Sequence, residues 1–236
     1  MAMVRVPATG DRGAEAAVNS ARGGEFQPRP CGPAPQVLVS GPEVGMNSAT
    51  PRLRPAHAGW IEVIAGGMFS GKSEELIRRL RRARIARQAV QAFKPSIDDR
   101  YDAGAIVSHD ATSIESTPVA DVAALRRALA PETQVIGIDE AQFLGPAVVA
   151  LCVELARTGK RVIVAGLDMD YRGEPFEPVP QLMAVAEEVT KTHAVCLVCG
   201  APASHSQRIV ADEGRVLVGA SEAYEPRCRD CFEAPA

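Results

Sequence analysis

The sequence has few aromatic residues and no long apolar run, and its positive and negative charges nearly balance. Aromatic residues make up 4% of the chain, too few for the stacking platforms that bind single-stranded nucleic acid. No apolar stretch approaches the roughly 20 residues that span a bilayer, so a membrane-spanning protein is not expected. The 26 basic residues stand against 29 acidic ones, and the net charge of −3 gives no overall attraction to nucleic acid.

The composition that remains is typical of a globular protein. Hydrophobic residues make up 46% and charged residues 23% of the sequence, which are ordinary proportions for soluble domains. A chain of 236 residues predicts one to two domains at roughly 150 residues each. It is long enough to bury a sizeable core without the help of disulfides.

The chain divides into three parts. Residues 1–58 contain eight of the 18 prolines and no lysine, and they show no sustained helical or strand period, so we expect a disordered arm. A secretory signal is not expected, because no apolar segment follows the start, and Met46 is an alternative start of translation. Residues 59–190 predict an α/β nucleotide-binding domain, and residues 191–236 predict a small metal-binding lobe.

Strands alternate with helices through the middle part, which predicts a parallel sheet with helices on both faces. A polar, irregular loop is expected over residues 94–117. The predicted strands are 60–65, 90–93, 135–138 and 161–165, and the predicted helices are 72–87, 119–129, 146–157 and a short stretch at 182–189.

A glycine motif follows the first predicted strand and precedes the first predicted helix. Residues 66–73 fit the G-x-x-x-x-G-K-[ST] phosphate-binding pattern in the context that the pattern requires. Its backbone N–H groups can curl around phosphates at a helix N-terminus, Lys72 can reach the β/γ-phosphates, and the Ser73 hydroxyl can ligate Mg²⁺. The residues predicted to bind phosphate here are Gly66, Gly67, Met68, Phe69, Ser70, Gly71, Lys72 and Ser73.

Two adjacent carboxylates end the strand predicted at residues 135–138. The carboxyl edge of an open parallel sheet is where ligands bind, so Asp139 is a candidate to hold Mg²⁺ through water. Glu140 is a candidate base. The alternatives for Glu140 are a surface glutamate at a strand end or, in a P-loop ATPase, a group that polarises water.

Two cysteine pairs lie near the C-terminus, Cys196 with Cys199 and Cys228 with Cys231. Four thiolates suit a closed tetrahedral zinc site, whereas disulfides or a redox pair are less compatible with an intracellular nucleotide-binding protein. The segment between the pairs is longer than a bare zinc ribbon needs and could close over a substrate. A zinc-ribbon nucleic-acid-binding module remains an alternative. The negative net charge and the low content of aromatic residues argue against it.

Five blocks of sequence carry a resemblance to a known family: residues 67–73, 98–101, 139–143, 166–168 with 171–173, and 218–224. With the cysteine pairs, they make the chain resemble thymidine kinase of the zinc-containing cellular and bacterial type over roughly residues 59–232. The resemblance implies transfer of the ATP γ-phosphate to the 5′-hydroxyl of thymidine, giving dTMP and ADP. It further implies a cytoplasmic homotetramer with feedback inhibition by dTTP.

The resemblance also implies roles for individual residues. Glu140 would be the general base, and Arg100 would stabilise phosphate charge in an ATP site that includes Asp139 and Gln142. Main-chain groups of Ser206, Leu217 and Gly219 would bind thymine, and Tyr224 would cap the sugar. The residues expected to line the base are Met68, Phe143, Leu167 and Tyr171.

Overall fold

The computed structural model describes residues 59–97, 105–107, 113–210 and 222–234, all within a single unit that spans residues 52–236. The arm predicted at residues 1–58 lies outside the described residues, and its predicted disorder stays a prediction.

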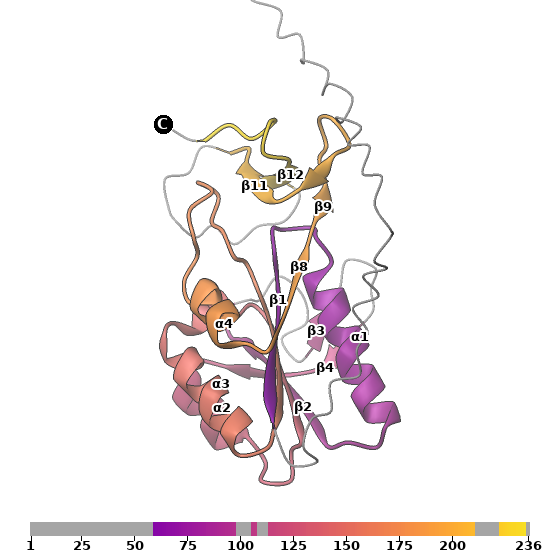
Figure 1. The fold of residues 1–236 in the computed structure, drawn as a ribbon, viewed down its shortest axis with the longest axis vertical. Coiled ribbons are helices and arrows are strands. Elements are labelled where there is room, and N and C mark those ends of the chain that lie inside the picture. Colours follow the sequence, from indigo (N-terminus) through magenta and orange to yellow (C-terminus); the bar gives the residue numbers. More distant parts are fainter. Residues whose placement is uncertain (1–58, 98–104, 108–112, 211–221, 235–236) are drawn as a thin grey trace, which may run out of the picture. The chain divides into compact units, whose positions relative to one another are not determined.

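Six parallel strands form the central sheet in the order β5-β2-β6-β7-β1-β8 (Figure 1). The buried residues of β2, β6, β7 and β1 are apolar apart from Glu62 and Lys94, as expected for parallel strands covered on both faces. The architecture confirms the predicted α/β fold class. The strands are β1 (Trp60–Gly66), β2 (Val90–Pro95), β5 (Thr117–Val119), β6 (Val135–Ile138), β7 (Arg161–Gly166) and β8 (Glu188–Thr192).

Helices cover both faces of this sheet (Figure 1). Helix α1 (Lys72–Ile85) packs on one face through Leu76, Ile77 and Leu80, whose spacing places them on one side of the helix. The other face carries α2 (Val122–Ala128), η1 (Ala141–Leu144), α3 (Ala147–Arg157) and α4 (Val179–Val185). Among the helices in the described part of the chain, none has the length and apolar character needed to cross a bilayer.

Two predictions of local structure were wrong. The loop expected over residues 94–117 contains an antiparallel pair, β3 (Ala105–Val107) and β4 (Ser113–Glu115). Ile106 and Ile114 are register partners in this pair and are buried in the same core cluster as the apolar residues of α1. Strands of three residues are too short to show an alternating hydrophobic pattern in the sequence, and packing holds them in place. The helix predicted from residue 119 begins only at Val122, because Val119 ends strand β5.

The short helix predicted at residues 182–189 was also partly wrong. Helix α4 begins earlier, and the chain then enters β8, a sixth strand that the sequence reading missed. On β8 the less exposed positions, Glu188, Thr190 and Thr192, are polar, and Thr190 accepts a hydrogen bond from Arg79 of α1, while Val189 is 42% exposed. The strand was therefore not predicted, because its sequence lacks the buried apolar residues that mark a strand.

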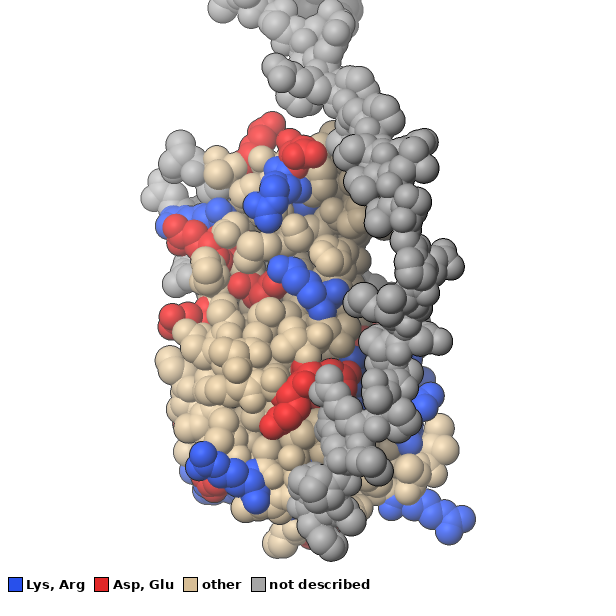
Figure 2. Space-filling view, in the orientation of Figure 1, with Lys and Arg blue, Asp and Glu red and all other residues tan. Residues whose placement is uncertain are grey.

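The C-terminal lobe consists of two small antiparallel pairs and their connecting turns. One pair is β9 (Ala194–Val195) with β10 (Pro202–Ala203), and the other is β11 (His205–Arg208) with β12 (Tyr224–Arg227). In Figure 1 the chain runs from β8 directly into β9, so the lobe continues from the edge strand of the sheet. Figure 2 shows acidic and basic side chains interspersed on the face that it presents.

A buried ionic cluster joins β1 and β7 to α1. The Glu62 carboxylate, 3% exposed, accepts hydrogen bonds from Arg79 Nη1 at 2.7 Å, from Arg161 Nε at 2.6 Å and from Trp60 Nε1 at 2.6 Å. Burial alone would raise the pKa of Glu62, but Arg161 and the other donors hold it below its usual range. The carboxylate is therefore ionised and compensates two arginines inside the fold.

Replacing Glu62 with Gln is expected to lower the free energy of unfolding by about 2–3 kcal/mol, because Arg79 and Arg161 both lose a buried counter-charge. The loss is limited because Glu75 and Glu188 still pair with Arg79. Urea unfolding followed by circular dichroism measures the change. The control is Glu154→Gln, which breaks an exposed pair with Arg126 and should shift the midpoint very little. A Glu62→Gln midpoint equal to that of the wild type would contradict this account.

Candidate active site

The phosphate-binding motif forms the turn between β1 and α1. Gly71 is the N-terminal cap of α1 and has left-handed backbone angles, φ 79° and ψ 19°, which a residue with a Cβ adopts only with strain. No side chain caps the helix, so its first N–H groups face the turn with the positive end of the helix dipole. Phe69 also has a positive φ of 63°. The backbone is thus shaped to receive an anion.

Side chains of the loop fasten it from within and to the neighbouring strand. Lys72 is buried, and its Nζ donates to the Gly67 carbonyl oxygen at 2.7 Å, which holds the ammonium over the loop. Ser70 Oγ donates to the same carbonyl oxygen at 2.8 Å and lies 2.9 Å from Thr192 Oγ1 at the end of β8. The loop is therefore anchored to the strand that leads into the C-terminal lobe.

Asp139 follows the last residue of β6 and lies beside the start of α1. It is 5% exposed and accepts hydrogen bonds from the Ser73 side chain and, at 3.0 Å, from the backbone N–H of Glu140. Burial, and then the charge of Glu140, raise the pKa of Asp139 to about 7. A cation bound here would favour the ionised carboxylate, so Asp139 and Ser73 are a suitable pair for holding Mg²⁺.

Glu140 is held in an unusual conformation next to this pair. Its backbone is left-handed, with φ 48° and ψ 42°, a strained state for a residue with a side chain. Gln142 Nε2 donates to the Glu140 carboxylate, while Gln142 Oε1 accepts from Leu167 N at 3.1 Å. A Cβ at Gly166 would lie 3.0 Å from Gln142 Oε1 and 2.7 Å from a Val179 methyl group, so the close approach requires glycine. Gln142 thereby orients the Glu140 carboxylate.

A cluster of aromatic and apolar side chains lies against the phosphate loop. Tyr171, Ala223 and Tyr224 are buried together, and Met68 and Phe69 of the loop pack on them. The backbone N–H of Met68 donates to Ser206 Oγ of β11 at 2.9 Å. Phe143 of η1 contacts Phe176 edge to face, with ring centroids 6.3 Å apart. The loop thus joins this cluster of aromatic and apolar side chains to the C-terminal lobe.

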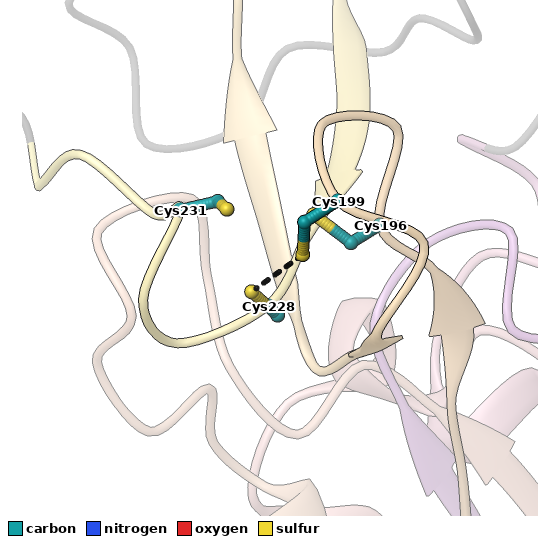
Figure 3. Close-up of side chains that lie close together, drawn as sticks. All are labelled: Cys196, Cys199, Cys228 and Cys231. Atoms are coloured by element: carbon teal, nitrogen blue, oxygen red, sulfur yellow. Dashed lines mark hydrogen bonds between the residues drawn. The ribbon is translucent and has the colours of Figure 1, made fainter. Parts of the chain in front are cut away.

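The four cysteines of the lobe lie together, and Figure 3 shows their sulfur atoms turned toward a common centre. All four Sγ atoms lie within 4.8 Å of one another, and Cys199 Sγ is 3.5 Å from Cys228 Sγ. Tetrahedral zinc with Zn–S distances of about 2.3 Å separates sulfurs by roughly 3.8 Å, so the cluster could hold this ion. Burial would raise the pKa of Cys196, but backbone N–H donors lower it to about 6. This favours the thiolate that a metal requires at Cys196, whereas hydrogen bonds with neighbouring thiols raise the pKa of Cys199 and Cys231.

Comparison with known proteins agrees with this geometry. The sequence model of the thymidine kinase family matches residues 59–232. The chain is 62% identical over 177 residues to the thymidine kinase of Rhodothermus sp. (strain ITI 518), covering 75% of this chain and 83% of the relative. It is 59% identical over 175 residues to that of Bdellovibrio bacteriovorus, covering 74% and 86%. The identity is 54% with that of Bacteroides fragilis, covering 74% and 87%.

The chain belongs to the thymidine kinase family. Membership confirms the resemblance seen in the sequence, the predicted enzyme class and the phosphorylation of thymidine as its function. It does not favour the P-loop ATPase or the zinc-ribbon nucleic-acid-binding module as alternatives.

Most residues that the sequence assigned to the thymidine kinase site lie near one another at the carboxyl edge of the sheet. Arg100, Leu217 and Gly219 lie outside the described residues, and their assigned roles stay predictions. Gln142, which was grouped with the ATP site, contacts Glu140 and Leu167. The contact with Glu140 lies within the motif block of residues 139–143, whereas the contact with Leu167 joins this block to that of residues 166–168.

The sequence reading missed two side chains near this site. Thr192 was not recognised because it ends the unpredicted strand β8, although it contacts Ser70 of the loop. Arg208 is buried between two tyrosines of the aromatic cluster. No motif marks either residue, and only the fold brings them to the site.

Proposed function

We propose that this thymidine kinase family member uses Glu140 as the general base for phosphoryl transfer from ATP to the thymidine 5′-hydroxyl. The observation that carries the proposal is the Glu140 carboxylate, which Gln142 orients beside the Asp139–Ser73 pair. A carboxylate so placed can accept the hydroxyl proton as the bond to phosphorus forms. A loose phosphoryl-transfer transition state needs mainly positioning and charge neutralisation, and this arrangement supplies both.

The ATP phosphates would lie in the loop of residues 66–73. Its backbone N–H groups and the N-terminus of α1 would bind the phosphate oxygens. Lys72, which donates to the Gly67 carbonyl oxygen, would donate to the β/γ-phosphates instead once ATP binds. Ser73 and Asp139 would hold Mg²⁺, which would supply charge neutralisation for the phosphates. Arg100 is proposed to add positive charge at the transferred phosphoryl group.

Thymidine would lie against the aromatic cluster. Met68, Phe143, Leu167 and Tyr171 are proposed to line the base, and Tyr224 to cap the sugar. Support comes from the packing of Met68 on Tyr171 and Tyr224, which joins this wall to the phosphate loop. The remaining thymine contacts are assigned to main-chain groups of Ser206, Leu217 and Gly219. An apolar wall with a few polar groups suits a 5-methylpyrimidine.

Zinc bound by Cys196, Cys199, Cys228 and Cys231 would be structural. Four protein ligands leave no open coordination position, so the ion would stabilise the lobe and take no part in phosphoryl transfer. A fixed lobe keeps Ser206 and Tyr224 beside the phosphate loop.

ADP release measured with and without thymidine tests whether the 5′-hydroxyl or water accepts the phosphoryl group. Transfer to thymidine predicts that ADP release depends on the nucleoside, because Glu140 then acts on the 5′-hydroxyl. Equal ADP release in the absence of thymidine would instead mean that Glu140 activates water, as in an ATPase.

Deleting residues 1–45 is expected to leave kcat and KM for thymidine unchanged, because the family match begins at residue 59. The truncated chain keeps the alternative start at Met46. Steady-state assays of the full and truncated chains side by side make the comparison. A clear loss of activity on truncation would overturn the proposal that the arm is dispensable.

We further propose, from the family resemblance, a cytoplasmic homotetramer with dTTP as feedback inhibitor. Light scattering of the purified chain measures its mass in solution. Competition between dTTP and thymidine in the phosphorylation assay tests the inhibition.

A further inference from the structure

Arg208 is a buried arginine at the edge of the aromatic cluster that contains Tyr171 and Tyr224. It ends β11 and is 9% exposed. Tyr224 begins β12 and is its register partner across the antiparallel pair. Arginine is seldom buried to this extent unless its charge is compensated, so its surroundings bear on its role.

The guanidinium contacts both tyrosines. Arg208 Nη2 donates to the Tyr224 hydroxyl oxygen at 2.7 Å. The guanidinium carbon lies 3.6 Å from the centroid of the Tyr171 ring and 5.3 Å from that of Tyr224. A cation this close to an aromatic face, and this well shielded from water, makes a strong cation–π interaction.

These contacts join parts of the chain that are distant in sequence. Tyr171 lies in the turn region after β7, Arg208 on β11 and Tyr224 on β12. Met68 and Phe69 of the phosphate loop pack on the cluster of the two tyrosines, and Arg208 contacts both tyrosines. A tyrosine side chain has two torsion angles, and a planar guanidinium that stacks on one ring and binds the hydroxyl of the other restricts both rings. Arg208 therefore contacts both tyrosine rings at once and couples their orientations.

We propose that Arg208 is a positioning residue that sets the two tyrosines for nucleoside binding. The inference rests on the proposed thymidine pocket, which includes both rings. Arg208 acts through Tyr171 and Tyr224, so its loss should weaken thymidine binding much more than ATP binding. The two tyrosines that it contacts belong to the aromatic cluster, whereas Lys72 donates to the phosphate loop and Ser73 donates to Asp139.

The test compares Arg208→Met, Arg208→Lys and the matched control Arg172→Met. Arg172 also contacts Tyr171, through Nε to the hydroxyl at 3.0 Å, but it is exposed. Arg208→Met should raise KM for thymidine on the order of tenfold, with KM for ATP and zinc content unchanged. Arg208→Lys keeps a donor for Tyr224 but loses the planar stack, so its KM should be intermediate. Arg172→Met should stay within about twofold of the wild type.

A wild-type KM for thymidine in folded Arg208→Met would overturn the inference. So would an equal rise in KM for ATP with loss of zinc, since that marks a purely structural residue. If Arg208→Met does not fold, Arg208→Lys alone carries the test; a raised KM for thymidine with an unchanged KM for ATP supports the inference, and an unchanged KM for thymidine overturns it. A wild-type chain unable to phosphorylate thymidine would instead overturn the proposed function before any variant is compared.

Discussion

Replacing Glu140 with Gln is expected to lower kcat for thymidine phosphorylation by a factor of about 10²–10⁴, the usual contribution of a general base. The amide has nearly the shape of the carboxylate but cannot take the 5′-hydroxyl proton. Gln142 can still donate to the side-chain oxygen at this position, so the local geometry should persist. KM for ATP should change little, because the phosphate contacts lie in the loop and in α1.

Single-turnover assays with saturating ATP and thymidine measure the chemical step of the Glu140 variant, and titration with a fluorescent ATP analogue measures nucleotide binding. Glu132→Gln is a matched control, since Glu132 is an exposed glutamate in the turn that precedes β6. It should behave as the wild type. Near-normal turnover in Glu140→Gln would remove Glu140 as the base.

Replacing Cys228 with Ser is expected to abolish zinc binding and to lower kcat/KM for thymidine by about a hundredfold or more. The strands of the lobe are two to four residues long, too short to be stable alone. Their apolar cluster is small and consists of Ala194, Cys196, Ala203 and Cys228 with Phe69 and two further residues packed against it. Without metal, this lobe should loosen, and Ser206 and Tyr224 should no longer be held beside the phosphate loop, where thymidine is proposed to bind.

Metal analysis by mass spectrometry, with activity measured on the same samples, tests this prediction. Cys152→Ala is the control, because burial in α3 raises the pKa of that thiol to about 12 and it lies outside the cluster. The control should retain one zinc ion per chain. A natively purified wild-type sample without zinc, or full activity in Cys228→Ser, would contradict the structural role.

The phosphate loop could be predicted from sequence because its chemistry is local. Glycines, Lys72 and Ser73 occupy fixed positions in one short stretch, and the strand before it and the helix after it are both strongly apolar on their buried sides. The strand prediction held even though Glu62 interrupts the apolar run, because Arg79 and Arg161 compensate that charge from other elements.

What could not be predicted depends on contacts between distant residues. On β8, Thr190 faces inward because Arg79 binds it, so the apolar pattern of an ordinary strand is absent. Gln142 was expected in the ATP site, but its contact with Leu167, 25 residues away, was not, and Arg208 contacts Tyr224, 16 residues away. No local period or composition distinguishes such residues from an ordinary surface glutamine or arginine.

The most direct test of the account follows the γ-phosphate itself. The purified full-length chain is incubated with Mg²⁺, γ-labelled ATP and each of the four deoxynucleosides in turn, and the products are separated and identified. Label in dTMP, with far less in the other three monophosphates, is the predicted result. Label only in inorganic phosphate, or no consumption of ATP in the presence of thymidine, would contradict it.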